Sequence, residues 1–174
     1  TAQGHINAML DADGILRHSL WSVTTPDNTE VPSLAAVTAA KYLAYQSGTE
    51  EQTADLDMVK RYLMEPPTDA RGFWYLPFTG LPGDYSESIS VSDILSGAVP
   101  ADYFADRIVL IGPYAAGLQD SYPTAIDHAQ PMYGVEYQAN VIEALLQENY
   151  KKEAADSWQY LALFLVTGAF GLWM

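Results

Sequence analysis

An apolar run in the second half of the chain is followed by two glycines, and the spacing of these glycines is that of a loop that could bind a phosphate. Ile108–Ile111 is followed by Gly112 and Gly117, which is the opening of a phosphate-binding loop. The lysine and the Ser/Thr that should follow are replaced by Leu118 and Gln119, so no side chain neutralises the phosphates or holds magnesium. A dinucleotide site would need G-x-G-x-x-G, which is absent.

The Asp11–Gly14 segment begins like a calcium loop, because Asp-x-Asp-Gly opens many of them. The later oxygen ligands and the bidentate glutamate that such a loop needs do not follow. The histidines, which are His5, His18 and His128, share no metal-ligand spacing. We therefore expect no metal site.

Catalytic arrangements are equally incomplete. Asp127 and His128 are adjacent, and neighbours in sequence rarely point at one another as an acid–base pair. No G-x-S-x-G elbow is present. The chain has no cysteine, which excludes disulfides, thiolate catalysis and sulfur-ligated metals. We expect a non-catalytic protein without a cofactor.

Composition indicates a folded acidic domain. With 174 residues, of which 49% are hydrophobic, the chain can bury one sizeable core. Eight basic and 22 acidic residues give a net charge of -14. Nucleic acids and anionic lipid surfaces need neutralising cations, so neither is an expected partner.

The first half of the chain predicts one hairpin and one clear helix. Ile6–Leu10 and Ile15–Val23 are strand-like runs on either side of Asp11–Gly14, whose Asp-Gly step favours a tight reversal. Ser33–Gln46 has the spacing of a helix with Ser33 as its cap. Leu56–Met64 is a short helix or a strand.

Further elements follow. The aromatic run Phe73–Phe78 predicts a strand. Ser90 and Asp93 have the spacing of a helix cap, which favours capping over catalysis. Pro100–Phe104 is a short helical lead-in to a buried strand at Arg107–Ile111.

A helix should begin at Gly134 and pack on that strand. Val135, Ala139, Ile142 and Leu146 share one of its faces, which we expect to lie against a sheet. A buried strand, a small-residue turn and a packing helix form the core of an α/β domain. The expected fold class is therefore α/β, a mixed sheet with packing helices in a single domain, plus a C-terminal apolar helix.

That C-terminal helix should occupy Trp158–Met174, which contains no charged residue. A membrane-spanning helix needs roughly 20 apolar residues, and Trp158 and Tyr160 stand where interfacial aromatics are expected. The alternative is an amphipathic core helix. Lys151 and Lys152 are a weak counter-signal, because the positive-inside rule places them on the wrong side.

Six ordered motifs give the chain a family resemblance. They read D-x-D-G-x-x-R, F-x-G-x-x-x-x-Y, S-x-x-D-[IV]-L, I-V-L-I-G-x-x-A-x-G-x-x-D, a following threonine, and G-V-E-x-x-A-N. The matching residues are Asp11, Asp13, Gly14, Arg17, Phe78, Gly80, Tyr85, Ser90, Asp93, Ile94, Leu95, Ile108–Asp120, Thr124, Gly134, Val135, Glu136, Ala139 and Asn140. In this order the chain resembles the type 2 CHASE domain, an extracytoplasmic sensor of bacterial transmembrane signalling proteins.

Two departures from the family pattern stand out. The usual Thr-Pro is broken, because Ala125 follows Thr124 and Pro123 precedes it. The family domain also has an earlier half before the D-x-D-G element, so the chain resembles the C-terminal half of the sensor. The expected division is a sensor part at residues 1–150, then a juxtamembrane linker and the start of a transmembrane helix at residues 151–174.

The resemblance implies a sensory, non-catalytic domain in a bacterial cell membrane receptor, facing the extracytoplasmic side. It would pass a small-molecule or protein signal to a cytoplasmic output module such as a cyclase or kinase. The membrane would be a partner through the C-terminal helix, with a homodimer as an option. The alternatives are an interaction module of the cell envelope that does not sense, and a secreted hydrolase.

The most promising ligand site is the loop after the Ile108–Ile111 strand. In open α/β sheets, ligands bind beyond the carboxyl ends of strands. Tyr114, Asp120 and Thr124 would offer a stacking face, an acceptor and a hydroxyl there. In the alternative interpretation, the glycines permit a tight turn and Asp120 satisfies its amides.

Overall fold

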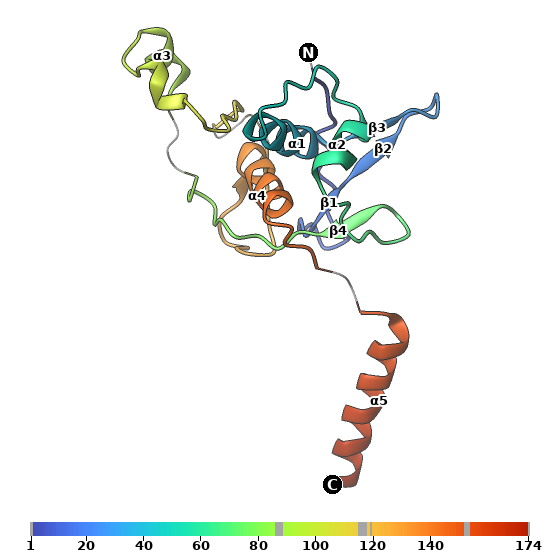
Figure 1. The fold of residues 1–174 in the computed structure, drawn as a ribbon. Helices are drawn as coiled ribbons and strands as arrows, with labels where there is room; N and C mark the ends of the chain where they lie inside the picture. Colours follow the sequence, from blue (N-terminus) through green and yellow to red (C-terminus); the bar gives the residue numbers. More distant parts are fainter. Residues whose placement is uncertain (1, 86–88, 115–117, 119, 152–153, 174) are drawn as a thin grey trace.

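Two helices form the centre of the molecule. The computed structural model describes residues 2–85, 89–114, 118, 120–151 and 154–173. Helix α1 (Leu34–Gln46) packs against α4 (Gly134–Leu146), as Figure 1 shows. The predicted cap of α1 is confirmed, because the Ser33 hydroxyl accepts from Ala36 N at 3.2 Å. The face of α1 that is buried consists largely of alanine, and small side chains let the two helices approach closely.

Around this pair lie short antiparallel ladders. Strand β1 (His18–Leu20) pairs with β4 (Phe73–Tyr75), and β2 (Ser22–Thr24) pairs with β3 (Glu30–Pro32). Strand β5 (Ser121–Tyr122) pairs with β6 (Met132–Tyr133), directly before α4. In the described part of the chain, the fold is therefore mixed α and β, with three two-stranded sheets.

The remaining helices are short, apart from the last. Helix α2 (Leu56–Tyr62) settles the ambiguous segment, and the Asp55 carboxylate caps it by accepting from Met58 N at 2.8 Å. Helix α3 (Val91–Leu95) begins at the predicted cap, Ser90. A 3-10 turn, η1 (Ala101–Phe104), stands at the predicted helical lead-in.

The core lies between α1, α2, α4 and the β1–β4 ladder. Its largest fully buried side chains are Trp74, Tyr137, Leu16, Met58, Met132 and Leu145. Burying a large apolar side chain contributes about 1.5–3 kcal/mol, so this cluster carries most of the stability of the body.

The hairpin predicted around Asp11–Gly14 is wrong, although its turn forms. Asp11 N donates to Ile15 O at 3.0 Å, and Gly14 takes a φ of 79° that favours glycine. Ile6–Leu10 is not a strand. Its neighbour His5 pairs instead with the start of α1, since Leu34 N donates to His5 O at 2.8 Å. The later run finds its partner in β4, far along the chain.

The buried strand predicted at Arg107–Ile111 is also wrong. Ile108 and Leu110 pack against the core, but Val109 is 47% exposed and Ile111 is 83% exposed. A strand needs a neighbour to satisfy its backbone, and none of the described strands lies beside this segment.

The predicted face of α4 is wrong in part, because Ile142 is buried and Leu146 packs against the core, but the helix packs mainly on another side. Its deepest side is formed by Tyr137, Val141 and Leu145, and α4 packs mainly against α1. Val135 and Ala139, on the predicted face, are only half-buried. The helix is apolar on two sides, so its spacing alone does not say which side meets its main partner.

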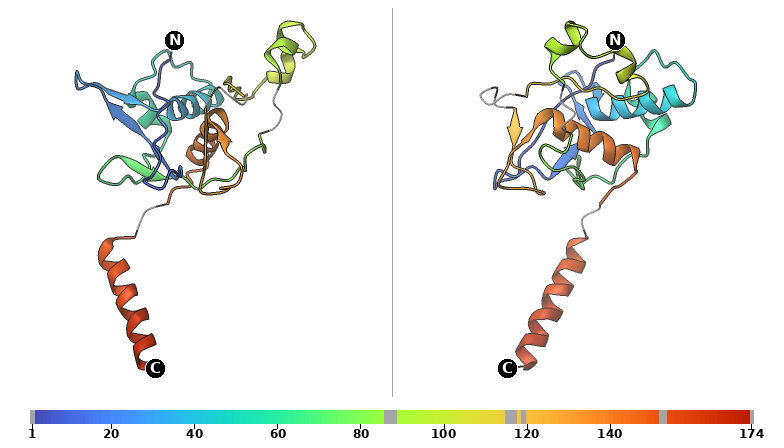
Figure 2. Two further views of the ribbon diagram at one scale, coloured as in Figure 1. Left: turned by 180° about the vertical axis from the view of Figure 1, so that it is seen from behind. Right: turned by 90° about the vertical axis from the view of Figure 1, so that its left-hand side faces the viewer.

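Helix α5 (Asp156–Trp173) confirms the helix expected from Trp158, while Met174 lies outside the described residues. It extends away from the body in both orientations of Figure 2. Its apolar side chains are exposed, among them Phe164 at 73% and Phe170 at 66%. Within the described residues, no helix combines the length and the apolar character needed to cross a membrane.

Candidate functional site

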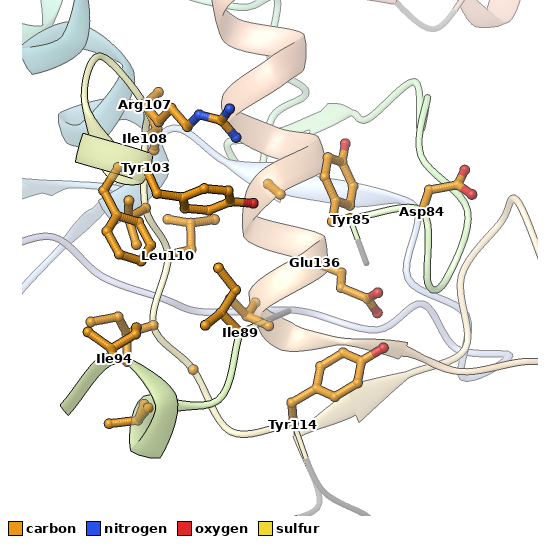
Figure 3. A pocket seen from close by; sticks show the side chains of 17 residues that line it. Asp84, Tyr85, Ile89, Ile94, Tyr103, Arg107, Ile108, Leu110, Tyr114 and Glu136 are labelled. Carbon is orange, nitrogen blue, oxygen red and sulfur yellow. The ribbon is translucent and has the colours of Figure 1, made fainter. Parts of the chain in front are cut away.

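A cavity of about 520 Å³ lies beside the first turns of α4. One wall is the stretch from Arg107 to Gly112, and the opposite wall is α4 at Val135, Glu136 and Ala139 (Figure 3). Between them the lining is completed by Asp84, Tyr85, Ile89, Val91 and Ile94. This volume is in the range of small-molecule sites, and the lining is mainly apolar. The geometry therefore suits binding.

Glu136 fixes the rim of this cavity from the first turn of α4. Its side chain is 3% exposed. One carboxylate oxygen accepts from Gly83 N at 2.8 Å, and the other reaches back to accept from Tyr133 N at 3.0 Å. A buried carboxylate that accepts two backbone N–H groups is well satisfied. Glu136 thus acts as a structural acceptor that ties the Gly83 loop to the helix start.

Asn140 continues this clamp one turn later. Its side chain is fully buried, and its Oδ1 accepts from Thr79 N at 3.1 Å and from Gly80 N at 3.0 Å. Its Nδ2 donates to Glu136 O at 3.1 Å. The G-V-E-x-x-A-N motif is therefore an interlock between α4 and the loop that carries the F-x-G-x-x-x-x-Y motif.

Tyr85 completes the same interlock. Its hydroxyl and that of Thr79 both donate to Glu143 Oε2, each at 2.8 Å. Burial, and then the Glu143 carboxylate, raise the pKa of Tyr85 far above its usual range. A Cβ on Gly80 would lie 2.5–2.9 Å from the ring and hydroxyl of Tyr85, so a larger residue at that position would have to displace the Tyr85 side chain.

Asp120, a predicted ligand residue, lies at the N-terminus of α4. Its carbonyl oxygen accepts from Gly134 N at 3.0 Å, and its carboxylate accepts from the Tyr122 hydroxyl at 3.2 Å. A Cβ added to Gly134 would overlap this carboxylate. A negative charge at the positive end of a helix is favourable, so Asp120 helps to fix where α4 begins.

Tyr114, the second predicted residue, lines the cavity. Its ring packs on Tyr133 with the centroids 4.1 Å apart. Burial, and then the charge of Glu136, raise the pKa of Tyr114. Tyr114 and Asp120 therefore both lie at the N-terminal end of α4.

Thr124, the third predicted residue, lies elsewhere. It is fully buried beside Leu16, whose N–H donates to Pro123 O at 2.8 Å. In the described part of the chain, its hydroxyl has no hydrogen-bond partner. Gly117 and Gln119 lie outside the described residues. That Tyr114, Asp120 and Thr124 bind a ligand stays a prediction.

The charged residues of the D-x-D-G-x-x-R motif bind one another. Arg17 binds Asp13 with both terminal nitrogens, at 2.9 and 2.7 Å, and binds Asp11 at 2.7 Å. The hydrogen bond from Arg17 lowers the pKa of Asp13 to about 2. Among the described residues, no cluster of three or more His, Asp or Glu side chains is arranged to hold a metal ion.

Glu136, Asn140 and Tyr85 are the residues that site prediction missed. They stand in the family motifs, which was the available signal, but their partners lie about 60 residues away along the chain. Helical periodicity does not reveal such long-range partners.

Comparison with protein families extends this picture. The model of the CHASE2 domain matches residues 1–173, essentially the whole chain. Searches among curated proteins and among solved structures each gave no match. Two of the motifs that carry the resemblance, F-x-G-x-x-x-x-Y and G-V-E-x-x-A-N, are the ones whose residues join the Thr79–Tyr85 loop to α4. The chain therefore belongs to the CHASE2 domain family, whose members are extracellular sensory domains of receptors.

Proposed function

We propose that this chain is the signal-input domain of a bacterial transmembrane receptor, on the extracytoplasmic side of the cell membrane. Membership of a sensory family supports the role. In this proposal, residues 1–150 form the sensor and residues 151–174 form the linker and the start of a membrane helix. A cytoplasmic output module such as a cyclase or kinase receives the signal.

Helix α5 is the observation that carries this proposal. Its apolar side chains are exposed along its length, including Leu161, Phe164 and Val166. An apolar surface of this kind is covered by lipid or by another protein in a stable arrangement. Trp158 and Tyr160, at its start, are residue types that favour the membrane interface.

A series of contacts runs from Tyr114 and Asp120 along α4 to Tyr150. Tyr114 and Asp120 contact the first turn of α4. Beyond the other end of α4, the Tyr150 hydroxyl donates to Met64 O at 3.0 Å, and its ring meets Trp74 edge-on at 5.8 Å. A signal that shifts α4 would move this anchor, which precedes α5 in the sequence.

The signal itself is a small molecule or a protein, and Tyr114, Asp120 and Thr124 are the residues that respond to it. A ligand can bias two arrangements only if it contacts them differently. The end of α4 that holds Tyr114 and Asp120 is where such a difference would reach the helix most directly.

The test uses a full-length receptor with a measurable output. Asp120→Ala and Thr124→Val should change the output, whereas the unfolding temperature should change little. Valine replaces threonine at nearly constant volume and removes an unpaired buried hydroxyl, so Thr124→Val costs little stability. Asp57→Ala is the control for loss of a carboxylate, because Asp57 is exposed on α2. If output falls only in step with stability, the loop has a structural role alone.

A further inference from the structure

The segment from Ala2 to His5, here named the strap, lies across the start of α1. His5 N donates to Pro32 O at 3.1 Å, and Leu34 N, in the first turn of α1, donates to His5 O at 2.8 Å. Gly4 lies closer still, since an added Cβ would be 2.6 Å from Leu34 Cα. Ala2 packs against the core. The strap is therefore fitted tightly onto the helix by backbone contacts.

The His5 imidazole is neutral in this arrangement. Its Nδ1 accepts from Asn7 N at 3.3 Å, so the neutral ring carries its proton on Nε2. Nε2 is buried and, within the described residues, has no hydrogen-bond partner. Burial lowers the pKa of His5. The charged form of the ring is thus disfavoured while the strap is in place.

The elements packed around His5 offer nothing that would offset a positive charge. In the part of the chain that the structure describes, burial alone shifts the pKa of His5, and no charged side chain contributes. The first turn of α1 has no acidic residue, and in β3 the Glu30 carboxylate accepts from the Ser22 hydroxyl at 2.6 Å. On the other side of Ser33, the buried indole N–H of Trp21 lacks an acceptor too. His5 also lies at the positive end of α1, where a cation is unfavourable.

We propose that His5 is an acid-sensitive latch, whose neutral ring closes the strap over the start of α1 and whose protonation releases it. A proton on Nδ1 removes the acceptor of Asn7 N and places an unpaired charge among buried groups. Release takes the acceptor from Leu34 N and loosens the start of α1, the helix that packs against α4. In a receptor, external acid would act on the sensor body through this segment. This last step alone rests on the proposed function.

Proton linkage sets the direction and the size of the effect. An exposed imidazole has a pKa of about 6.5, so the released strap gains a proton as pH falls below that value, whereas the closed strap resists it. Closure is therefore fully favoured above about pH 7 and is lost as pH falls. Between about pH 7.5 and about pH 5, the equilibrium constant for opening can rise by at most about thirtyfold. We expect a rise of at least about tenfold.

The test measures amide hydrogen exchange of the full chain at these two pH values, with α5 kept in a mild detergent. Each rate is compared with that of the unfolded sequence at the same pH, which removes the intrinsic pH dependence of exchange. The amides of His5 and Leu34 report on the strap, and the amide of Val141 in α4 reports on the core. Acid should lower the protection of His5 and Leu34 by about tenfold to thirtyfold and leave that of Val141 unchanged.

Two variants with a neutral side chain, His5→Gln and His5→Phe, separate the latch from other acid effects. In both, the protection of Leu34 should be the same at the two pH values. His128→Gln is the matched control, because His128 is exposed, and it should respond to acid as the parent chain does.

Several results would overturn the latch. A fall of protection in His5→Gln as large as in the parent chain would place the titrating group elsewhere. A parent chain without a response, or with protection that falls as pH rises, would equally exclude it. If the strap is already open in both variants at about pH 7.5, the parent chain decides. Its protection of Leu34 should then fall about tenfold between about pH 6 and about pH 5, and a flat profile overturns the proposal.

Discussion

Replacement of Asn140 by alanine should be among the most destabilising single changes in the body. The fully buried Asn140 side chain accepts from Thr79 N and Gly80 N, at 3.1 and 3.0 Å. Alanine leaves both amides without their acceptor, and each unsatisfied group costs about 1–3 kcal/mol. Counting both near the lower half of that range gives a loss of about 3 kcal/mol.

Thermal unfolding followed by circular dichroism, with α5 held in a mild detergent, measures this loss. For a chain of this size, 1 kcal/mol shifts the midpoint by about 2–4 °C, so Asn140→Ala should lower it by about 6–12 °C. Asn7→Ala is the matched control, because the Asn7 side chain is exposed. Equal midpoints for the two variants would refute the view that Asn140 holds the Thr79–Gly83 loop on α4.

The remaining predictions concern three other contacts. Arg17 lowers the pKa of Asp13 from 3.8 to about 2, so their pairing stabilises the fold above about pH 4 and is lost as pH falls toward 2. In Arg17→Gln the pKa of Asp13, measured by NMR titration, should return toward 3.8. Gly134→Ala should destabilise the chain by overlap with Asp120, and Asp120→Ala should relieve part of that loss in a double-mutant cycle. Phe164→Glu should abolish sedimentation with neutral phosphatidylcholine vesicles, because α5 is the expected membrane contact.

A specific result would contradict each of these three predictions. An unchanged Asp13 titration in Arg17→Gln would place the cause of the low pKa elsewhere. Strict additivity of the two changes in the cycle would mean that their side chains do not meet. For vesicle binding, Leu95→Glu is the control, since Leu95 is 82% exposed on α3 in the body. Equal loss of binding in both variants would mean that α5 is not the contact.

The sequence predicted elements that local chemistry determines. The helix over Ser33–Gln46 was predictable because Ser33 offers its hydroxyl to Ala36 N, a contact made within one turn. The turn at Asp11–Gly14 was predictable for the same reason. The prediction of a strand at Ile108–Ile111 was wrong. A strand needs a neighbour from elsewhere in the chain to pair its backbone, whereas a helix pairs its own.

In the candidate site too, local features were predictable from the sequence and contacts between distant segments were not. Tyr114 and Asp120 were selected because they follow an apolar run, and they do lie together at the start of α4. The sequence did not reveal that Glu136 accepts from Gly83 N, since that contact joins distant segments. Nor did it reveal that Thr124 is fully buried, because a threonine in a polar loop carries no signal of its depth.

We propose that the sensor part lies outside the cytoplasmic membrane and that α5 enters the membrane. The chain has no cysteine, so single cysteines at the exposed Glu50 and at Val166 on α5 report on each region. A full-length receptor without other cysteines is treated with a membrane-impermeant maleimide in spheroplasts. Glu50→Cys should be labelled without lysis, and Val166→Cys should be labelled only in detergent. Labelling of Glu50→Cys only after lysis would contradict an extracytoplasmic sensor part.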